Sequence, residues 1–440
     1  MKMQTNYMQI NPNFKQNNLP HQKFTLDNGI RVLVTELPHT RSVTLTLYVA
    51  TGARYEAARV GGISHFIEHM LFKGTRKRPT AHDIAVAIES IGGFFNASTG
   101  HELTNYWVKV AYQHFALGLD VLSDMLRASR FDPAEVEKER RVIIEELRQT
   151  LDTPDELVFF DLDALMWLPH PLGRDVAGSP ETVNAITRAD MLEYLARHYH
   201  AQNLVVSVGG YTRANEIVPQ LNAALGALRP RAPKKFSRFA PTQRAARWHV
   251  RYKKTEQAHV AVATWAYDRN HPDRYAVTLL NTILGDGMSS RLFQEIREKR
   301  GLAYTVSSFG SALEDCGYFG SYAAVEPKNA AATLRVILDE WARLATDPVP
   351  TEELAKAKEL IKGGLLLSME DTHSIAGWYG RQEALRQPIM TVDDVTAQID
   401  AVTVADIQRV ARALFRDDWL NLAVVGPFKA EDQFARLLHF

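Results

Sequence analysis

A long-range internal repeat limits the fold of this chain more than any other feature of its sequence. In the first half a helical pattern, ITRADMLEYLARHY, leads into the apolar segment NLVVSV, which begins at Asn203. In the second half VTVADIQRVARALF leads in the same way into NLAVVG, which begins at Asn421, 218 residues later. Solenoid repeats have periods of roughly 20–50 residues, so a period of this length indicates two duplicated domains.

A basic, proline-containing segment separates the two halves. Residues 229–254 hold ten Lys and Arg, three prolines and no Asp or Glu, a composition typical of a solvated linker. The sequence therefore predicts a polar N-terminal arm (1–22), an N-terminal domain (23–228), the linker (229–254) and a C-terminal domain of the same fold (255–440).

Each half contains strand patterns followed by pairs of helical patterns. Asp27-Asn28-Gly29 predicts a hairpin turn, because Asn-Gly tolerates the positive φ angles that such a turn requires. Residues 43–49 alternate between aliphatic side chains and Thr or Tyr, as a half-buried strand does. Strands interleaved with helix pairs predict an α+β fold of two duplicated α/β-sandwich domains, each a mostly antiparallel sheet with helices packed on one face.

The composition excludes several classes of function. The 51 Lys and Arg balance the 51 Asp and Glu, so the positive charge typical of a nucleic-acid-binding protein is missing. No apolar run approaches the ~18 residues that span a bilayer, and a single cysteine, Cys316, cannot form an internal disulfide. Residues 1–22 lack the apolar core of a signal peptide. We therefore expect a cytoplasmic protein that binds neither nucleic acid nor membranes.

Residues 61–75 (GGISHFIEHMLFKGT) contain a candidate metal-binding motif. The segment is apolar enough for a buried helix, on which residues three and four apart share a face. His65 and His69 can then bind one metal ion, with Glu68 beside them, in the order H-x-x-E-H. The alternative is a core without a metal, which is disfavoured because burying three ionisable groups is costly.

A second helical pattern, which begins at Pro133, offers candidates for a third ligand. Catalytic zinc usually takes three protein ligands and keeps a fourth position open. Glu139 and Glu146 are seven residues apart, so they share one face of this helix. From the spacing alone, an exposed and charged helix surface is an equally good interpretation of these glutamates.

Three segments, in this order, resemble one family: HFIEHMLFKGT, ERRVIIEE and HPLGRDVAGSPETV. They are similar to motifs of the pitrilysin-type inverzincin metallopeptidases, which include mitochondrial processing peptidase and insulin-degrading enzyme. The similarity runs from about residue 23 to residue 428 and implies a zinc endopeptidase with one Zn²⁺ per chain. The residues that match the family are the zinc ligands His65, His69 and Glu146, the general base Glu68 and the supporting acid Glu139. The neighbouring Glu145 is disfavoured as a ligand.

The second half lacks the metal motif. Its equivalent helix, near residues 279–285, has no histidine, and Gly363 and Gly364 stand opposite the glutamates of the first half. Arg297 and Tyr304 match an Arg and a Tyr that contact substrate in the resembled family. By this resemblance Tyr304 could stabilise an oxyanion and Arg297 could anchor a peptide carbonyl or carboxylate. Without it, they are a surface helix residue and a half-buried strand residue.

Substrate binding and assembly are predicted from the same resemblance. Asn96 and Ala97 lie in FFNAST, which resembles the family's substrate-binding edge strand; a peptide can pair with such an edge through main-chain hydrogen bonds. Family members enclose peptides in a chamber of four half-units and this chain supplies two, so we expect a homodimer. A heterodimer with a related subunit that removes targeting sequences is the alternative. The intact motif disfavours a zinc-free structural subunit.

Overall fold

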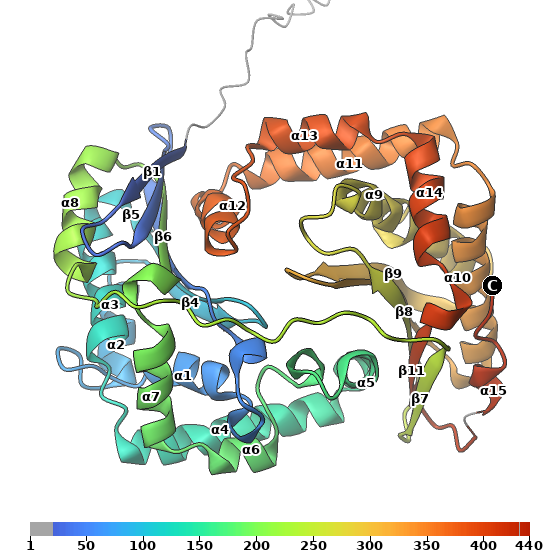
Figure 1. Cartoon of the computed structure of the whole chain (residues 1–440), viewed down its shortest axis with the longest axis horizontal. Coiled ribbons are helices and arrows are strands. Elements are labelled where there is room, and N and C mark those ends of the chain that lie inside the picture. The colour runs from blue at the N-terminus through green and yellow to red at the C-terminus, as the bar shows by residue number, and fades with distance from the viewer. Residues whose placement is uncertain (1–20, 431) are drawn as a thin grey trace, which may run out of the picture.

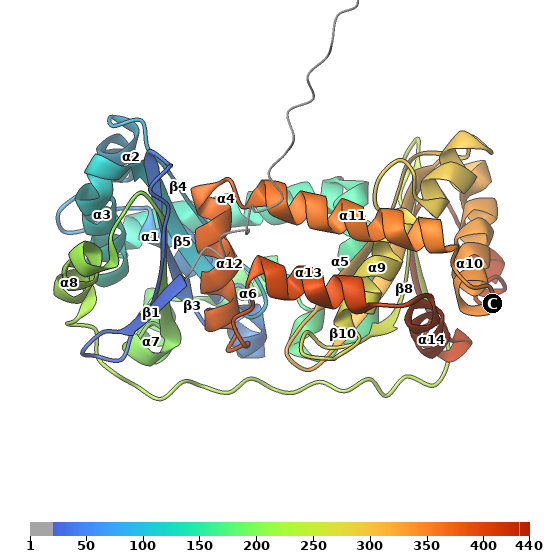
Figure 2. The ribbon, with the colours of Figure 1, turned by 90° about the horizontal axis from the view of Figure 1, so that it is seen from above.

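The computed structural model describes residues 21–430 and 432–440, so the arm predicted over residues 1–22 lies almost entirely outside the described residues. The chain forms two α/β units that lie side by side, each built around one β-sheet (Figures 1 and 2). All strands of one sheet come from the first half of the chain and all strands of the other come from the second half. This arrangement agrees with the duplication that the repeat predicts.

The N-terminal sheet has six strands in the order β1-β2-β6-β3-β5-β4. Its strands are β1 (His21–Thr25), β2 (Arg31–Glu36), β3 (Ser42–Val49), β4 (Phe94–Thr99), β5 (Thr104–Ala111) and β6 (Leu204–Gly210). Neighbouring strands are antiparallel except β2 and β6. The predicted hairpin joins β1 to β2, with Gly29 at a φ of 91° that other residues adopt only with strain.

Most helices of the first half cover one face of this sheet, and apolar side chains of both layers form the core. These helices are α1 (Ile63–Leu71), α2 (Ala81–Glu89), α3 (Phe115–Ala128), α4 (Pro133–Asp152), α6 (Pro180–Ala185), α7 (Arg188–His198) and α8 (Ala214–Leu225). Strand β4 forms one edge of the sheet and contacts α1. The predicted edge strand and the predicted metal helix are therefore neighbours.

The C-terminal sheet has five strands in the order β7-β11-β8-β10-β9, and only β7 and β11 run parallel. Its strands are β7 (Arg247–Tyr252), β8 (Ala258–Ala266), β9 (Ala303–Ala312), β10 (Gly317–Val325) and β11 (Asn421–Gly426). The helices that share its core are α9 (Arg274–Gly285), α10 (Ala330–Thr346), α11 (Thr351–Ser368), α13 (Val392–Ala401), α14 (Val404–Leu414) and α15 (Asp432–Ala435). None of the helices in the described residues is long and apolar enough to cross a membrane.

The predicted linker extends too far along the chain. Residues 229–246 contain neither helix nor strand, but residues 247–252 form β7. Although residues 247–252 are as basic as the rest of the predicted linker, their backbone pairs with β11, residue by residue from Arg247 to Tyr252. Main-chain hydrogen bonds to the sheet outweigh the linker-like composition here.

Each sheet also receives one helix from the opposite half of the chain (Figure 1). Helix α5 (Pro154–Trp167) packs on the C-terminal sheet, and α12 (Thr372–Ala384) packs on the N-terminal sheet. The cluster under α5 includes Val158, Leu162, Ala261 and Ala423. The cluster under α12 includes Leu33, Val205, Ile375 and Tyr379. The helices of each half thus cover one face of their own sheet, as predicted, and the opposite face, which is also apolar, is buried by one helix from the other half.

A buried ionic network joins the two halves. The side chain of Arg54 is fully buried and donates to Glu102 Oε1 at 2.5 Å and to Asp315 Oδ1 at 3.0 Å. Arg269, from the second half, also donates to Glu102, and the ring of Phe236 lies 3.7 Å from the Arg54 guanidinium. Buried charges are strongly destabilising when one partner is lost, so this network and the exchanged helices hold the halves in one relative position.

Candidate active site

Helix α1 presents its two histidines on the face that turns away from the core. Phe66, Ile67 and Met70 are buried against the sheet, which leaves His65 and His69, one helical turn apart, on the opposite side. The start of the helix is held by Glu56, whose carboxylate accepts the N–H groups of Gly62 at 2.7 Å and Ser64 at 2.8 Å. Burial of this carboxyl raises the pKa of Glu56 to about 7.

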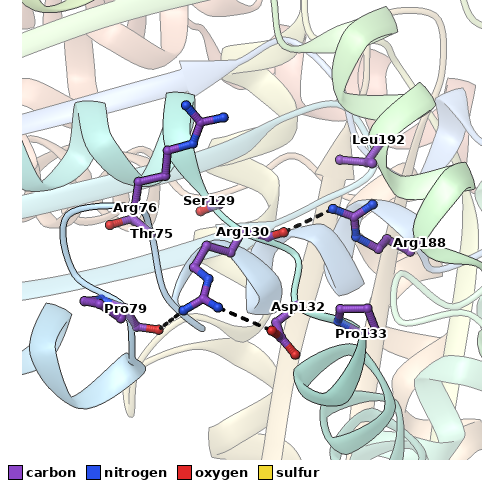
Figure 3. A pocket seen from close by; sticks show the side chains of 9 residues that line it. All are labelled: Thr75, Arg76, Pro79, Ser129, Arg130, Asp132, Pro133, Arg188 and Leu192. Carbon is purple, nitrogen blue, oxygen red and sulfur yellow. Dashed lines mark hydrogen bonds and ion pairs between the residues drawn. The ribbon is translucent and has the colours of Figure 1, made fainter.

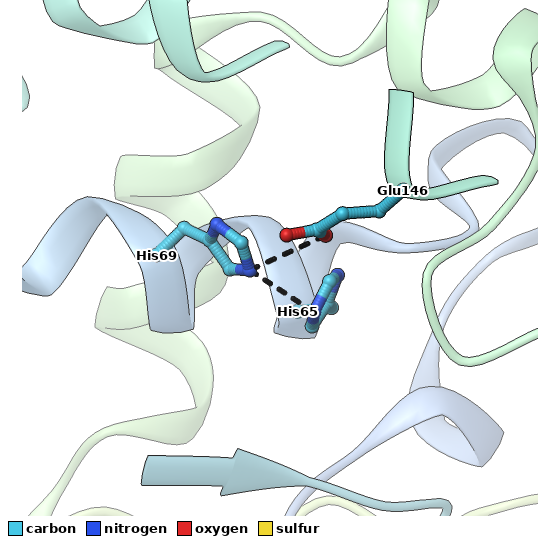
Figure 4. Close-up of side chains that lie close together, drawn as sticks. All are labelled: His65, His69 and Glu146. Atoms are coloured by element: carbon cyan, nitrogen blue, oxygen red, sulfur yellow. Dashed lines mark hydrogen bonds and ion pairs between the residues drawn. The ribbon is translucent and has the colours of Figure 1, made fainter. Parts of the chain in front are cut away.

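Three candidate ligands converge between α1 and α4 (Figure 4). The Nε2 atoms of His65 and His69 are 3.1 Å apart, and Glu146 Oε2 lies 3.7 Å from His69 Nε2. Each residue offers one ligand atom, and these atoms lie within 4.8 Å of one another. Glu145, one position earlier on α4, is instead exposed and pairs with Arg148.

This donor set fits zinc. Two nitrogen ligands at ~2.0–2.1 Å from a tetrahedral ion stand about 3.3 Å apart, close to the 3.1 Å between the two imidazoles. Burial, with the nearby His69, lowers the pKa of His65 to about 4, so this imidazole is neutral at pH 7 as a ligand must be. Its Nδ1 is buried and has no hydrogen-bond partner among the described residues.

The orientation of the second imidazole is set by a glutamate behind it. Glu139, which is almost fully buried, accepts from His69 Nδ1 at 2.9 Å, and this leaves Nε2 free to face the ligand cluster. Lys73 Nζ lies 2.6 Å from the other oxygen of Glu139. Burial opposes ionisation of this carboxyl, yet His69 and Lys73 hold the pKa of Glu139 below its usual value. For His69, burial would lower the pKa, but Glu139 and Glu146 outweigh it and raise the pKa.

Glu68 stands beside the three candidate ligands without being one of them. Its Oε2 accepts a hydrogen bond of 2.5 Å from Thr99 Oγ1, at the end of β4. Burial raises the pKa of Glu68, and the nearby charge of Glu146 acts in the same direction. A higher pKa makes a carboxylate a stronger base, which is the property that proton abstraction from water requires.

The predicted peptide-binding residues lie on a free sheet edge. Asn96 and Ala97 belong to β4, whose backbone pairs with β5 on one side only. Asn96 Oδ1 accepts the main-chain N–H of Ala97 at 2.8 Å, so a side chain occupies this donor in place of a further strand. A cap of this kind protects an edge strand from unwanted pairing.

Arg297 and Tyr304 contact each other, not the candidate ligands. Arg297 Nη1 donates to the main-chain oxygen of Tyr304 at 3.2 Å, and its guanidinium lies 4.4 Å from the centre of the tyrosine ring. The Tyr304 side chain is 74% exposed. Within the described residues of one chain, neither side chain has a hydrogen bond or ion pair to His65, His69 or Glu146.

A separate cavity of about 670 Å³ lies at the start of α4 (Figure 3). Two of its three arginines are engaged locally: Arg130 donates to Pro79 O at 3.4 Å, and Arg188 donates to Phe131 O at 2.7 Å. Phe131 has a φ of 48°, which is strained for a residue with a side chain. These contacts brace the loop that leads into α4, and none of the candidate ligands lines the cavity.

Three residues that support the candidate site were not predicted from the sequence. Lys73 follows His69 by four residues inside the quoted motif, so helical spacing could have connected it to the same face. The contacts of Glu56 and Thr99 depend on a loop and on strand register, respectively. No local pattern in the sequence predicts these contacts.

Comparison with known proteins places the chain in a family. Residues 31–179 match the family model described as Insulinase (Peptidase family M16), and residues 185–361 match the model described as Peptidase M16 inactive domain. An uncharacterized zinc protease of Streptomyces coelicolor is 39% identical over 428 residues, which cover 95% of this chain and 92% of that protein. The chain belongs to peptidase family M16. This confirms the resemblance seen in its motifs.

A further relative and one solved structure are also similar to this chain. The uncharacterized zinc protease YmxG of Bacillus subtilis is 34% identical over 92% of this chain and 98% of its own length. The crystal structure of a protease from Helicobacter pylori has the same fold, with a TM-score of 0.89 at 24% identity, over 93% of this chain and 99% of that one. The description of the second family domain as inactive agrees with the described part of residues 255–440, where no comparable group of His, Cys, Asp or Glu side chains converges.

Proposed function

We propose that this M16 peptidase is a zinc-dependent endopeptidase that hydrolyses extended, unfolded peptides. The observation that carries this proposal is the convergence of His65, His69 and Glu146, whose ligand atoms lie within 4.8 Å of one another. Two neutral nitrogens and one carboxylate form the ligand set of several catalytic zinc sites. Relatives that are named zinc proteases favour the same metal.

The residues around the metal position have different roles in the proposed reaction. When bound, zinc would act as a Lewis acid that polarises the scissile carbonyl and makes the attacking water more acidic. Glu68 removes the proton of this water and can deliver it to the leaving amine. The raised pKa of the Glu68 carboxyl suits both steps, because the group must accept a proton and then release it. Glu139 keeps the His69 ring in the ligand orientation.

The free edge of β4 is the proposed binding site for the peptide backbone. An extended peptide can add to this edge as a further strand, next to α1 and therefore next to Glu68. Pairing with Ala97 N–H requires the peptide carbonyl to displace the amide oxygen of Asn96. Main-chain pairing selects for extended conformation more than for sequence, so folded proteins are expected to resist cleavage.

We further propose that two chains form the active species. Within the described residues, Arg297 and Tyr304 have no hydrogen bond or ion pair to the proposed zinc ligands of their own chain, and Tyr304 is largely exposed. In a homodimer these side chains would reach the metal half of the partner chain. A mixture of two inactive variants tests this arrangement, because Glu68→Gln in one chain and Tyr304→Phe in the other would together leave one complete site per mixed dimer. Recovery of activity on mixing supports the homodimer, and no recovery refutes it.

Metal content and peptide cleavage test the enzyme assignment. Glu68→Gln removes the base while all three ligands remain, so we expect full zinc content and no turnover of a quenched fluorescent peptide. Glu145→Gln is the matched control, since Glu145 is exposed and pairs with Arg148, and it should behave as wild type. Turnover by Glu68→Gln would refute the assignment of the base, and a wild-type chain that fails to bind zinc would refute the metal site. Activity only after addition of a second, different subunit would support the heterodimer instead.

A further inference from the structure

One hydrogen bond connects the proposed base to the proposed peptide-binding strand. Thr99 Oγ1 donates to Glu68 Oε2 at 2.5 Å. Within the described part of the chain, it is the one hydrogen bond that the Glu68 side chain receives. In the ionised form that a general base requires, Glu68 accepts this bond as a charge-assisted one, of the stronger kind.

The register of β4 fixes the direction of the Thr99 side chain. Alternate residues of a strand point to opposite faces, and Phe94, Asn96 and Ser98 are exposed, whereas Phe95 and Ala97 pack against the core that α1 shares. Thr99 continues the inward series and pairs across the sheet with Thr104. Its hydroxyl therefore points towards α1 because the backbone of the sheet holds it there.

We propose that Thr99 is a positioning residue for catalysis: by holding Glu68 Oε2, it leaves Oε1 as the oxygen that faces the attacking water. This inference rests on the proposed peptidase function. A carboxylate without this restraint rotates about its terminal torsion, which has a broad energy profile, and it presents a productive oxygen for only part of the time. Since Thr99 belongs to β4, the base is also held relative to the strand that would bind the peptide.

Two substitutions at one position separate the hydroxyl from the shape of the side chain. Thr99→Val keeps the branched shape and removes the donor, and we expect kcat to fall on the order of 10- to 100-fold, part of the ~10²–10⁴-fold that a general base contributes. KM and the zinc dissociation constant should not change. Thr99→Ser retains the donor and should restore most of the lost kcat.

A matched control removes a hydroxyl from the same sheet. Thr46, in β3, is buried and its Oγ1 has no hydrogen-bond partner among the described residues, so Thr46→Val should leave kcat, KM and zinc affinity unaltered. If Thr99→Val does not fold, as judged by its circular dichroism spectrum, then Thr99→Ala and Thr99→Ser supply the same comparison.

Several outcomes would overturn the inference. They are an unchanged kcat in Thr99→Val, an equal loss in Thr99→Val and Thr99→Ser, and a loss of zinc from Thr99→Val, which would make the residue a structural support of the metal site. Failure of the proposed function looks different, because the zinc-loaded wild type would then cleave no peptide. If the wild type is active and Thr99→Val has the same kcat, this inference is wrong and the proposed function still stands.

Discussion

Replacing Glu139 with Gln should weaken zinc binding without removing a ligand. Glu139 is only 2% exposed, and its two oxygens face His69 Nδ1 at 2.9 Å and Lys73 Nζ at 2.6 Å. Gln keeps the shape and one acceptor, so the His69 ring can stay in place. The negative charge that makes this imidazole more basic is lost, and the new amide N–H₂ competes for a position next to the Lys73 ammonium.

The size of the effect follows from these contacts. Partners of ligating histidines typically contribute about 10- to 100-fold in metal affinity, which corresponds to ~1.4–2.7 kcal/mol. We expect a loss in the upper part of this range, because Gln at this position both removes a charge and places two donors, an amide and an ammonium, against each other. The Lys73 ammonium, which shared the carboxylate with His69, then loses its acceptor in a largely buried site.

Competition with a chromophoric zinc chelator, at fixed pH and ionic strength, measures the dissociation constant directly. Glu145→Gln, on the exposed side of the same helix, should match wild type. Glu146→Gln, which removes a ligand, should lose more affinity than Glu139→Gln. A dissociation constant of Glu139→Gln equal to wild type would refute the role of the buried carboxylate, and one equal to that of Glu146→Gln would show that Glu139 is itself a ligand.

Three further predictions concern stability and reactivity. Arg54→Ala leaves the buried Asp315 without its cation and removes one of the two arginines that pair with Glu102, so it should lower the free energy of unfolding by about 3–5 kcal/mol. Arg59→Ala, which breaks an exposed pair, should cost less than about 1 kcal/mol. Denaturant titration of both variants checks this difference, and equal losses would contradict it. Burial raises the pKa of Cys316 to about 12, so a thiol-reactive disulfide reagent at neutral pH should label the unfolded chain but not the folded one. Burial raises the pKa of Glu56 from 4.5 to about 7, so its contribution to stability is complete below the unfolded pKa and is lost as the pH rises through the folded pKa. The free energy of unfolding of wild type relative to Glu56→Gln should therefore decline by ~3 kcal/mol between those pH values, and a flat difference would contradict the raised pKa.

Those parts of the fold that follow from local patterns could be predicted from the sequence. The β1–β2 hairpin and the alternating strand β3 are encoded by neighbouring residues, and the duplication is visible in the long-range repeat. The exchange of α5 and α12 between the halves could not be predicted. Helix α5 carries Leu157, Val158, Phe159 and Phe160 in succession, which indicates burial on several sides. Such a pattern does not say which sheet provides the contact, because that choice depends on the whole tertiary structure.

The candidate site shows the same division between local and distant information. His65 and His69 are placed together by the period of one helix, so the spacing alone predicts a shared face. The adjacent glutamates Glu145 and Glu146 are chemically identical, and the packing angle of α4 on α1 decides that the second faces the histidines while the first faces solvent. The bond from Thr99 to Glu68 spans 31 residues and depends on strand register, which a single sequence does not determine.

The differences between the two halves favour completion of the site by a second chain. The two sheets are held together by α5, by α12 and by the buried Arg54 network. Bringing the exposed Tyr304 to the metal half of the same chain would therefore require breaking both apolar clusters and buried ion pairs. In α11, a Cβ at Gly363 or Gly364 would meet no atom of the described residues within 4 Å, apart from the nearby backbone of the helix itself, so packing among these residues does not account for the two glycines. Glycine in the interior of a helix costs about 1 kcal/mol relative to alanine. Close approach of a second chain, or of a peptide held between two chains, would give that cost a physical reason.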